Sequence, residues 1–421
     1  MTVSLHRATA DDLPAMATVD GRAFGIDYSD QDLTDLRLIL DPDRFVLARD
    51  SGTTGGGTTG GGATRGGATR GGGDHAAEGE IVGVAGSFPF AITPPGGAPI
   101  AAEGVTWVSV AATHRRRGIL RAMLGDLHAG YAAAGTPLAV LTASEGGIYG
   151  RFGYGVATTG RNVEIDRSRA VLRADAPDPG GVRFASTAEV RERVPDIHRR
   201  WCAGQPGALS RPSPWWDFAL LDRPHQRRGG TSRFHLLHAD GYVGYRLDSG
   251  VCRVVDFFAV TDEARIALWR VLLAMDLVTT VATGAVADDD PLRWLLTDAR
   301  AVRTTRVGDD VWARVLDTPA VLAARRYAVD VDAVLEVRDP DGYAAGRFRL
   351  RGGPDGAECL PTDDAADLAL DVPALGAIAF GGTRVHTLAR AGRVSAADPA
   401  VARRLDAACT AEREPYAGTH F

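Results

Sequence analysis

VTWVSVAATHRRRGILRAMLGDLHAGYAAAGTPLAVLTASEGGIYGRFGYGVAT, residues 105–158, is the stretch from which the fold of this chain can be read. Its first six residues are mostly apolar and rich in valine, which predicts a buried strand over 105–110. From Ile119 the apolar residues recur at the spacing of one helix face, at Leu120, Met123, Leu124, Leu127 and Tyr131. Gly135 and Pro137 end that helix, and residues 138–141 predict the next strand.

The turn between this strand and this helix has the composition of an anion site. The first turn of a helix leaves backbone N–H groups unpaired, and its dipole favours negative charge there. Gly118 permits a close approach of the backbone to a ligand, because it has no side chain. Arginines at positions 115, 116, 117 and 121 add fixed positive charge and forked hydrogen-bond donors. A pyrophosphate is the ligand that suits this turn.

The spacing of the arginines and the glycine in this turn limits which class of pyrophosphate-containing ligand it can bind. It is neither the GxxxxGK[ST] of a P-loop nor the GxGxxG of a dinucleotide site. Arg-x-x-Gly-x-Leu over residues 115–120 resembles the coenzyme A loop of the GNAT acyltransferases, although Leu120 stands where glycine or alanine is usual. Taken alone, the motif also fits a solvated basic helix start, because all 47 basic residues of this chain are arginine.

The residues that follow extend the resemblance. SVAATHRRRGILRAML, residues 109–124, and AVLTASEGGIYGRFGYG, residues 139–155, together resemble the enhanced intracellular survival (Eis) family of N-acetyltransferases. With the layout and the end of the chain, the resemblance covers nearly the whole sequence. It implies an α/β (α+β) fold with tandem GNAT-like domains, whose sheets are mixed and twisted, and a C-terminal sterol carrier protein-like α/β domain.

Three domains are expected along the chain. The first, a GNAT acetyltransferase domain, spans 1–167 and contains a flexible glycine-rich insertion at 51–75, which cannot bury apolar surface. The second, over 168–306, opens at Val182 with the same order of strand, polar cap and helix as Val3. Its turn at 260–265 is acidic, so we predict a degenerate GNAT-like domain without cofactor. The third spans 307–421, and its segment 312–327 is predicted to be a helix.

The composition of the chain limits the classes of partner, and the cellular location, that we expect. The net charge of −6 argues against nucleic acid as the main partner. The cysteines are far apart and form no CxxC motif, so we expect reduced thiols and no metal. The N-terminus lacks the apolar core of a signal peptide, and no run predicts a membrane span. We therefore expect a cytoplasmic protein.

Gly146–Gly155 places three aromatic residues among glycines, which fits either a tight turn with packed rings or a backbone close to a cofactor. Acyl transfer from coenzyme A to an amine expels a thiolate, and a phenol beside the sulfur can protonate it. The resemblance gives this role of general acid to Tyr149, whereas Tyr154 is expected to pack.

The resemblance also implies the other site residues. The free carboxylate of the terminal Phe421 is the general base, with His420 where an acidic residue might be expected. Asp27 and Trp107 line the entrance for the amine. The residues expected to hold acetyl-CoA are Val108, Ser109 and Val110 beside its pantetheine, Arg116, Arg117, Gly118, Ile119, Leu120 and Arg121 at its pyrophosphate, and Ser144 and Glu145 near the acyl group.

The sequence thus predicts an acetyl-CoA-dependent N-acetyltransferase that acts, by direct transfer, on amine groups of polycationic small molecules such as aminoglycosides. Acetyl-CoA is a cosubstrate, and no metal is required. The resemblance implies a homohexamer. A polyamine or protein-lysine acetyltransferase remains an alternative, as does a non-catalytic acyl-CoA or lipid-binding protein.

Overall fold

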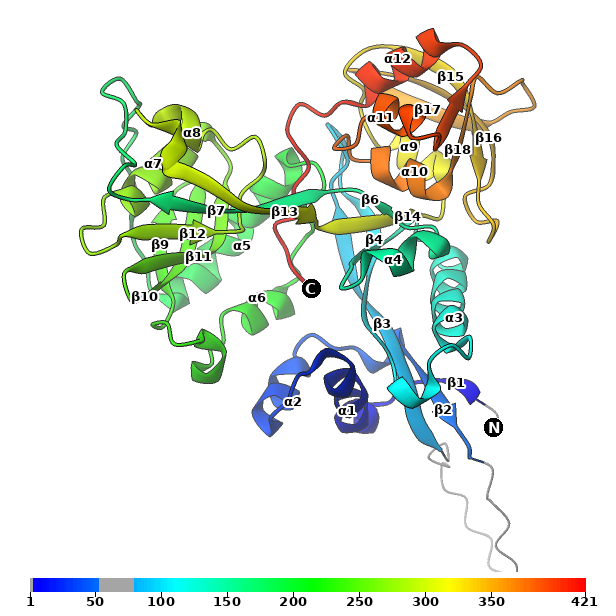
Figure 1. The fold of residues 1–421 in the computed structure, drawn as a ribbon, viewed down its shortest axis with the longest axis horizontal. Helices are drawn as coiled ribbons and strands as arrows, with labels where there is room; N and C mark the ends of the chain where they lie inside the picture. The colour runs from blue at the N-terminus through cyan, green and yellow to red at the C-terminus, as the bar shows by residue number, and fades with distance from the viewer. Residues whose placement is uncertain (1–2, 53–78) are drawn as a thin grey trace, which may run out of the picture. The chain divides into compact units, whose positions relative to one another are not determined.

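A computed structural model describes residues 3–52 and 79–421 of the chain (Figure 1). The predicted insertion at 51–75 therefore lies almost wholly outside the described residues. The chain divides into two compact units, one of Met1–Phe88 with Val105–Ala129 and one of Pro89–Gly104 with Gly130–Phe421. In the described residues the strands form three sheets, and each sheet mixes parallel and antiparallel pairs.

The first unit contains strands in the order β1-β2-β3-β4. The bounds are β1 (Val3–Arg7), β2 (Phe45–Asp50), β3 (Glu80–Ile92) and β4 (Ile100–Val110), and the last two strands continue into the second unit. The helices are α1 (Leu13–Phe24), α2 (Asp30–Leu36) and α3 (Ile119–Ala133). Gly83 of β3 faces Ile119 and Met123 of α3, and a Cβ there would lie about 3.1 Å from Ile119. The strand, turn and helix predicted from residues 105–135 are confirmed.

In the second unit the same sheet continues as β4-β5-β14-β6. Here β5 (Leu138–Thr142) runs parallel to β4, and β14 (Val311–Val315) is antiparallel to both β5 and β6 (Gly155–Val156). The helix predicted over 312–327 is wrong, since β14 occupies its first part and only α9 (Thr318–Ala323) is helical. Val311, Ala313 and Val315 are fully buried, because β14 pairs with a strand on each side.

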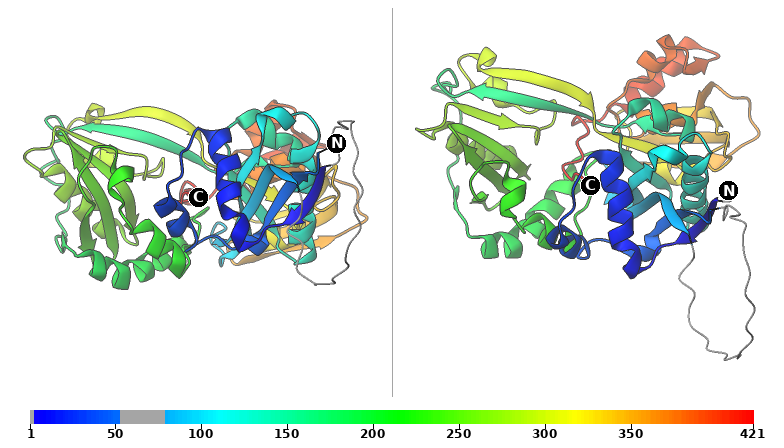
Figure 2. Two further views of the ribbon diagram at one scale, coloured as in Figure 1. Left: turned by 90° about the horizontal axis from the view of Figure 1, so that it is seen from below. Right: turned by 60° about the horizontal axis from the view of Figure 1, so that its bottom comes forward.

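The second sheet has the order β13-β7-β12-β11-β10-β9-β8. Figure 2 shows the long pair of β7 (Thr159–Asp166) and β13 (Val302–Asp309). The other strands are β8 (Arg183–Phe184), β9 (Phe234–His238), β10 (Gly241–Asp248), β11 (Val251–Ala259) and β12 (Thr280–Thr283). The helices are α5 (Thr187–Gly204), α6 (Ser213–Ala219), α7 (Asp262–Leu273) and α8 (Leu292–Leu295). Ser249 and Gly250, with φ of 48° and 85°, form the hairpin turn between β10 and β11.

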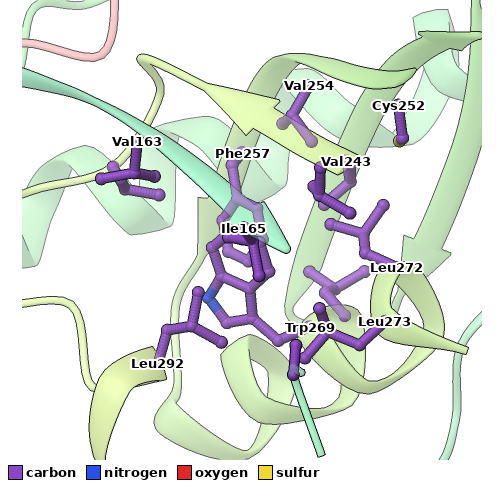
Figure 3. Packing of buried hydrophobic residues seen from close by; sticks show 14 of the residues in the cluster. Val163, Ile165, Val243, Cys252, Val254, Phe257, Trp269, Leu272, Leu273 and Leu292 are labelled. Atoms are coloured by element: carbon purple, nitrogen blue, oxygen red, sulfur yellow. The ribbon is translucent and has the colours of Figure 1, made fainter. Parts of the chain in front are cut away.

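The second sheet repeats the plan of the first. Its strands β11 and β12 are parallel and joined by α7, just as β4 and β5 are joined by α3. Val251–Val254 pair with Thr280–Thr283, after which β11 leaves β12 but stays paired with β10 as far as Ala259. Trp269 of α7 is fully buried, and its ring centroid lies 4.8 Å from that of Phe257 (Figure 3). A second GNAT-like sheet, predicted from the echo of Val3 at Val182, is therefore confirmed.

The last sheet has the order β17-β16-β15-β18-β19. Its strands are β15 (Val331–Arg338), β16 (Gly346–Gly353), β17 (Gly356–Pro361), β18 (Leu368–Asp371) and β19 (Val394–Ala396). The helices are α10 (Val372–Ile378), α11 (Val385–Arg390) and α12 (Pro399–Cys409). Arg325, which is buried, donates to the carbonyls of Ile378 and Ala379 at the end of α10 and of Cys409 at the end of α12.

Strands are exchanged across the expected domain limits. The second sheet takes β7 from before residue 168, and the first sheet takes β14 from after residue 306. The limits at 167 and 306 therefore stay predictions. All four cysteines are buried and free. In the described part of the chain, no helix is long and apolar enough to cross a membrane.

Ser186 is the polar cap predicted at the start of the repeated unit, and its contribution to the stability of the protein can be measured. Its hydroxyl accepts a hydrogen bond from the Glu189 backbone N–H at 3.2 Å, at the start of α5. We expect Ser186→Ala to cost about 1 kcal/mol and to lower the midpoint of thermal unfolding by about 2–4 °C. Calorimetry checks this. Ser186→Asp, which keeps an acceptor, should retain the wild-type midpoint, and equal losses in both variants would contradict the cap.

Candidate functional site

The predicted anion loop lies in the first unit, between β4 and α3. Arg116 and Gly118 both have left-handed backbone, with φ of 62° and 79°. Such alternation turns successive N–H groups toward one side, which makes an anion-binding concavity. A Cβ at Gly118 would meet no atom within 4 Å, so the approach to this backbone is open. Arg115, Arg116 and Arg117 are exposed, and the loop fits a pyrophosphate.

Strand β4 enters this loop through an irregular stretch. Trp107 has φ of 54°, a conformation that is rare for a bulky residue. Val108 and Val110 are half-buried on either side of Ser109, whose buried hydroxyl has no hydrogen-bond partner in the described structure. A strand edge with an unused polar group suits the amides of pantetheine, which can pair with backbone.

Trp107 also meets the segment that carries Asp27. The Tyr28 ring stacks on Trp107 with centroids 5.8 Å apart, and the Tyr28 hydroxyl donates to buried Asp20 at 2.8 Å. Burial raises the pKa of the Asp20 carboxyl, against the effect of that hydrogen bond. Asp27 itself is exposed and lines a pocket of about 530 Å³ between α1 and α2. The two residues predicted for substrate thus belong to one neighbourhood of the first unit.

Tyr149 lies in the second unit, on the short helix α4 (Gly146–Tyr149) that follows β5. Its side chain is 5% exposed, and its ring meets that of Tyr154 edge-on at 6.0 Å. Burial, and then the charge of Glu145, raise the pKa of the Tyr149 phenol above its usual value of 10. The phenol therefore keeps its proton at neutral pH. Ser144 and Glu145 are exposed at the start of α4, and Tyr154 is fully buried.

The C-terminal residue is held at the end of β5. The Phe421 backbone oxygen accepts a hydrogen bond from the Thr142 hydroxyl at 3.4 Å, and its ring lies 5.1 Å from that of Phe90. A Cβ on Gly104 would lie 2.9 Å from the Phe421 ring, so a larger residue would displace the tail. Thr142 begins the segment that leads to Tyr149. The structure therefore brings Phe421 to the same strand end as Ser144, Glu145 and Tyr149.

A cavity of about 500 Å³ lies beside this tail, and sequence reasoning missed it. Its walls come from β7, β11, β13, α6 and the tail residues Tyr416, Gly418, Thr419 and His420. Asp309 and Asp310 line it together with Arg161 and Arg306. Burial raises the pKa of the Asp310 carboxyl, although His420 and a hydrogen bond from Thr158 act in the opposite direction. These residues are far apart in sequence, so only pairing of the strands brings them together.

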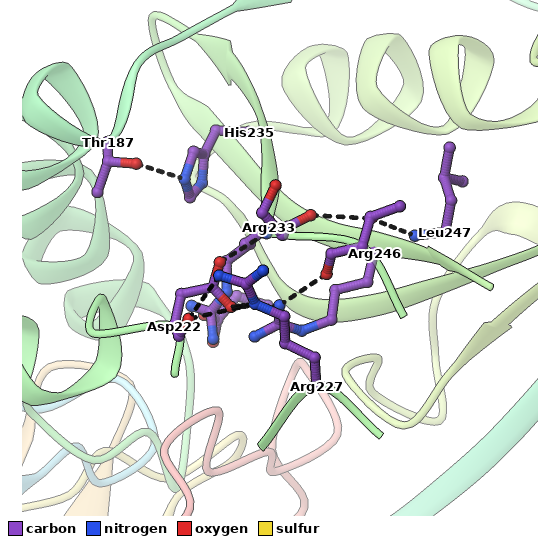
Figure 4. A network of polar contacts seen from close by, with 10 residues as sticks. Thr187, Asp222, Arg227, Arg233, His235, Arg246 and Leu247 are labelled. Carbon is purple, nitrogen blue, oxygen red and sulfur yellow. Dashed lines mark hydrogen bonds and ion pairs between the residues drawn. The ribbon is translucent and has the colours of Figure 1, made fainter. Parts of the chain in front are cut away.

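An arginine pair forms another wall of the cavity. Arg211 and Arg233 bind Asp256 at 2.8 and 3.4 Å. Both arginines lower the pKa of the Asp256 carboxyl against the strong opposing effect of burial. The backbone N–H of Arg233 donates to Asp222, which also binds Arg227 and Arg246 (Figure 4). Asp256 therefore offers little free negative charge to a ligand.

Comparison with known proteins gives the family. A curated relative, the N-acetyltransferase Eis of Mycobacterium tuberculosis, is 39% identical over 97% of both chains. This chain belongs to the Eis family of N-acetyltransferases. An uncharacterized N-acetyltransferase from Streptomyces coelicolor is 43% identical over 74% of this chain and 79% of its own.

Solved structures and family models agree with this membership. The crystal structure of Eis1 from Mycobacterium abscessus matches with a TM-score of 0.83 and 32% identity over the whole of both chains. A GCN5-related N-acetyltransferase from Anabaena variabilis, at 15% identity and a TM-score of 0.82, shares the fold. Models of the acetyltransferase (GNAT) domain match residues 67–157 and 207–315, and the sterol carrier protein domain matches 318–418. This Eis-family protein is therefore an N-acetyltransferase with two GNAT domains and a C-terminal sterol carrier protein-like domain. GNAT domains use acetyl-CoA, and the absence of a cofactor from the second one stays a prediction.

The described residues contain no group of three or more His, Cys, Asp or Glu side chains placed to hold a metal ion. Cys202, which lies 3.5 Å from His198, is buried, and burial raises the pKa of its thiol to about 12. A neutral, enclosed thiol is a poor nucleophile, so it offers no support for an acyl-cysteine intermediate.

Proposed function

We propose that this protein transfers the acetyl group of acetyl-CoA directly to amine groups of polycationic small molecules such as aminoglycosides. The observation that carries the proposal is the ordered C-terminus, with Phe421 hydrogen-bonded to Thr142 at the strand end that leads to buried Tyr149. A frayed terminus would have no such partners. The Phe421 carboxylate, held at the end of β5, and the protonated phenol of Tyr149, on the short helix that follows β5, supply the base and the acid that amine acylation uses.

The roles of the chain's residues follow from their chemistry. The Phe421 carboxylate attracts the ammonium group and takes its proton, directly or through water. The neutral amine then attacks the thioester carbon, and the bond from carbon to sulfur breaks. Tyr149 donates its proton to the departing sulfur, which leaves as the free thiol of coenzyme A. The nitrogen gives up its second proton to the Tyr149 phenolate, directly or through water, so the product is the neutral amide. Val108–Val110 would pair with pantetheine, Arg116–Arg121 would hold the pyrophosphate, and Ser144 and Glu145 would adjoin the acyl group.

Each unit, taken by itself, has carboxylates that are available to a cation. Asp27 is exposed beside the stacked pair of Tyr28 and Trp107. Asp309 and Asp310 line the cavity beside the tail, but Arg306 and His420 line it as well. Because these cationic and titratable groups reduce the negative charge there, we expect a narrower range of polycations than an all-acidic cavity would accept.

Release of free thiol from acetyl-CoA tests the proposal. The acceptor panel consists of aminoglycosides, polyamines and lysine peptides. Release at several molar equivalents of aminoglycoside would support the proposed substrate class. Release only with polyamines or lysine peptides would move the acceptor to that class, and binding of acetyl-CoA without release from any amine would overturn the enzymatic role.

The arginine loop gives a separate prediction for the cosubstrate. We expect Arg116→Gln combined with Arg117→Gln to raise the KM for acetyl-CoA by about tenfold, because charge-assisted hydrogen bonds to phosphate are worth about 1.5–3 kcal/mol each when buried and less at an exposed loop. The KM for the amine should not change. Arg199→Gln, which changes an exposed arginine of α5 far along the chain from this loop, is the matched control with an unchanged KM. Equal effects from all three positions would point to general charge rather than to a phosphate site.

The resemblance to the family also leads us to propose a homohexamer that works in the cytoplasm. Light scattering after gel filtration measures the mass of the assembly directly. A monomer of 44.4 kDa would contradict the hexamer.

A further inference from the structure

The C-terminal tail is bound by one short segment, residues 205–211, which we call the docking loop. On one side the loop forms an antiparallel bridge between Leu209 and Ile92 of β3. On the other side Leu209 N–H donates to the Ala417 carbonyl at 3.0 Å, and Tyr416 N–H donates to the Pro206 carbonyl at 2.9 Å. The loop therefore pairs the tail, through its own backbone, to the end of a long strand.

Arg211 at the end of the docking loop makes those of the loop's contacts that lie nearest to the terminus. Its Nη2 donates to the Gly418 carbonyl at 2.8 Å, and its Nε donates to the Thr419 hydroxyl at 3.1 Å. The Thr419 hydroxyl in turn donates to the Leu209 carbonyl at 3.0 Å. One planar guanidinium thus fixes two consecutive tail residues, and Phe421 follows two residues later.

Arg211 is itself held on three sides. Asp256 accepts from its Nη2 at 2.8 Å, and the guanidinium lies 5.1 Å from the Trp216 ring and 4.9 Å from the Phe258 ring. Its side chain is 8% exposed. The tail has equally little freedom, because Gly418 has φ of 65° and a Cβ there would lie 2.2 Å from Trp201.

We propose that Arg211 is a positioning residue that sets the place of the Phe421 carboxylate. The proposal rests on the proposed function, in which that carboxylate is the base. The physical reason is that proton transfer requires its partners within hydrogen-bond reach, and displacement by about 1 Å can cost 10²-fold in rate. Without Arg211 the last four residues lose their strongest anchor and sample many positions.

Kinetics of two substitutions test this role. We expect Arg211→Gln to lower kcat by about 10–100-fold with the KM for acetyl-CoA unchanged. Arg211→Lys should recover only part of the native kcat, because an ammonium group cannot reproduce the planar guanidinium that binds Gly418, Thr419 and Asp256. Arg227→Gln is the matched control and should keep the native kcat, since Arg227 binds Asp222 and not the tail. An unchanged kcat in Arg211→Gln, or full recovery by lysine, would overturn the proposal.

Digestion with a carboxypeptidase that prefers aromatic C-terminal residues measures directly how accessible the end of the tail is. Release of phenylalanine should be slow from the native protein and at least tenfold faster from Arg211→Gln. Thr419→Val, which leaves the pair of Arg211 and Asp256 intact, should show a smaller increase and serves if Arg211→Gln does not fold. An unchanged release rate in both variants would overturn the docking role.

A double variant separates this proposal from the catalytic one. Adding glycine after Phe421 in the Arg211→Gln background should lower kcat no further than the stronger single change, because both act on one carboxylate. Multiplied losses would overturn the positioning role. If the extension is harmless in the native background, the carboxylate is not the base, and the digestion experiment still reports whether Arg211 docks the tail.

Discussion

Replacing Tyr149 by phenylalanine is expected to lower kcat by about 10²–10⁴-fold, the usual contribution of a positioned general acid. Phenylalanine keeps the buried ring and its edge-on contact with Tyr154 at 6.0 Å but removes the proton donor. Binding of acetyl-CoA should not change, since in the proposed mechanism the phenol acts only on the departing sulfur. Thiol release measures turnover, and titration calorimetry measures binding. Tyr149→Ala should lose turnover to at least the same extent.

Two controls accompany the substitution of Tyr149: a substitution of the neighbouring Tyr154, and the pH dependence of turnover. Tyr154→Phe changes a fully buried phenol that we expect only to pack, and it should stay within about threefold of native kcat. Burial raises the pKa of Tyr149, so the acid keeps its proton to higher pH than an exposed tyrosine. The native enzyme should therefore lose no activity through Tyr149 between about pH 6 and 9. Normal turnover in Tyr149→Phe would refute the general-acid role.

Moving the terminal carboxylate is the second large effect we expect. Two glycines added after Phe421 should lower kcat by about 10²-fold, because the carboxylate is displaced from the strand end where Thr142 holds it. The new peptide bond at Phe421 is neutral and cannot take a proton. The KM for acetyl-CoA should be unaffected, as the anion loop is untouched.

A tag of the same two glycines at the N-terminus is the control for this extension. It adds the same mass without changing the carboxylate and should leave kcat unaltered. Full activity of a C-terminal fusion would contradict the role of Phe421 as base, whatever its binding of acetyl-CoA.

Local sequence patterns were sufficient to predict much of the secondary structure of this molecule. The strand, arginine turn and helix from Val105 to Ala133 follow from periodicity and from Gly118, which can adopt the φ of 79° that it has. The echo at Val182 correctly predicted a strand, a polar cap and a helix, and the cap is Ser186. The failure at residues 312–327 is equally informative. Trp312-Ala-Arg-Val was read as the start of a helix, but pairing with β5 and β6 made it a strand.

The cavity beside the tail could not have been predicted in the same way. Arg161, Arg211, Asp256 and Asp310 lie on four different segments, and no spacing along the chain relates them. Arg211 also gave no signal, because arginine is the only basic residue besides histidine in the sequence. Its importance appears only in the contacts with Gly418 and Thr419.

The sequence alone indicated the local chemistry that we propose for this protein: a turn of arginine and glycine suited to phosphate, and a tyrosine among glycines. Hydrogen bonds within a turn and the periodicity of a helix depend on neighbours in the chain, so they can be read from it. The tertiary structure alone decided where the terminus lies, which residues anchor it and which strands β14 joins. Those outcomes depend on pairing between segments separated by 100 residues or more, such as Thr142 and Phe421 with a separation of 279, and no local pattern encodes them.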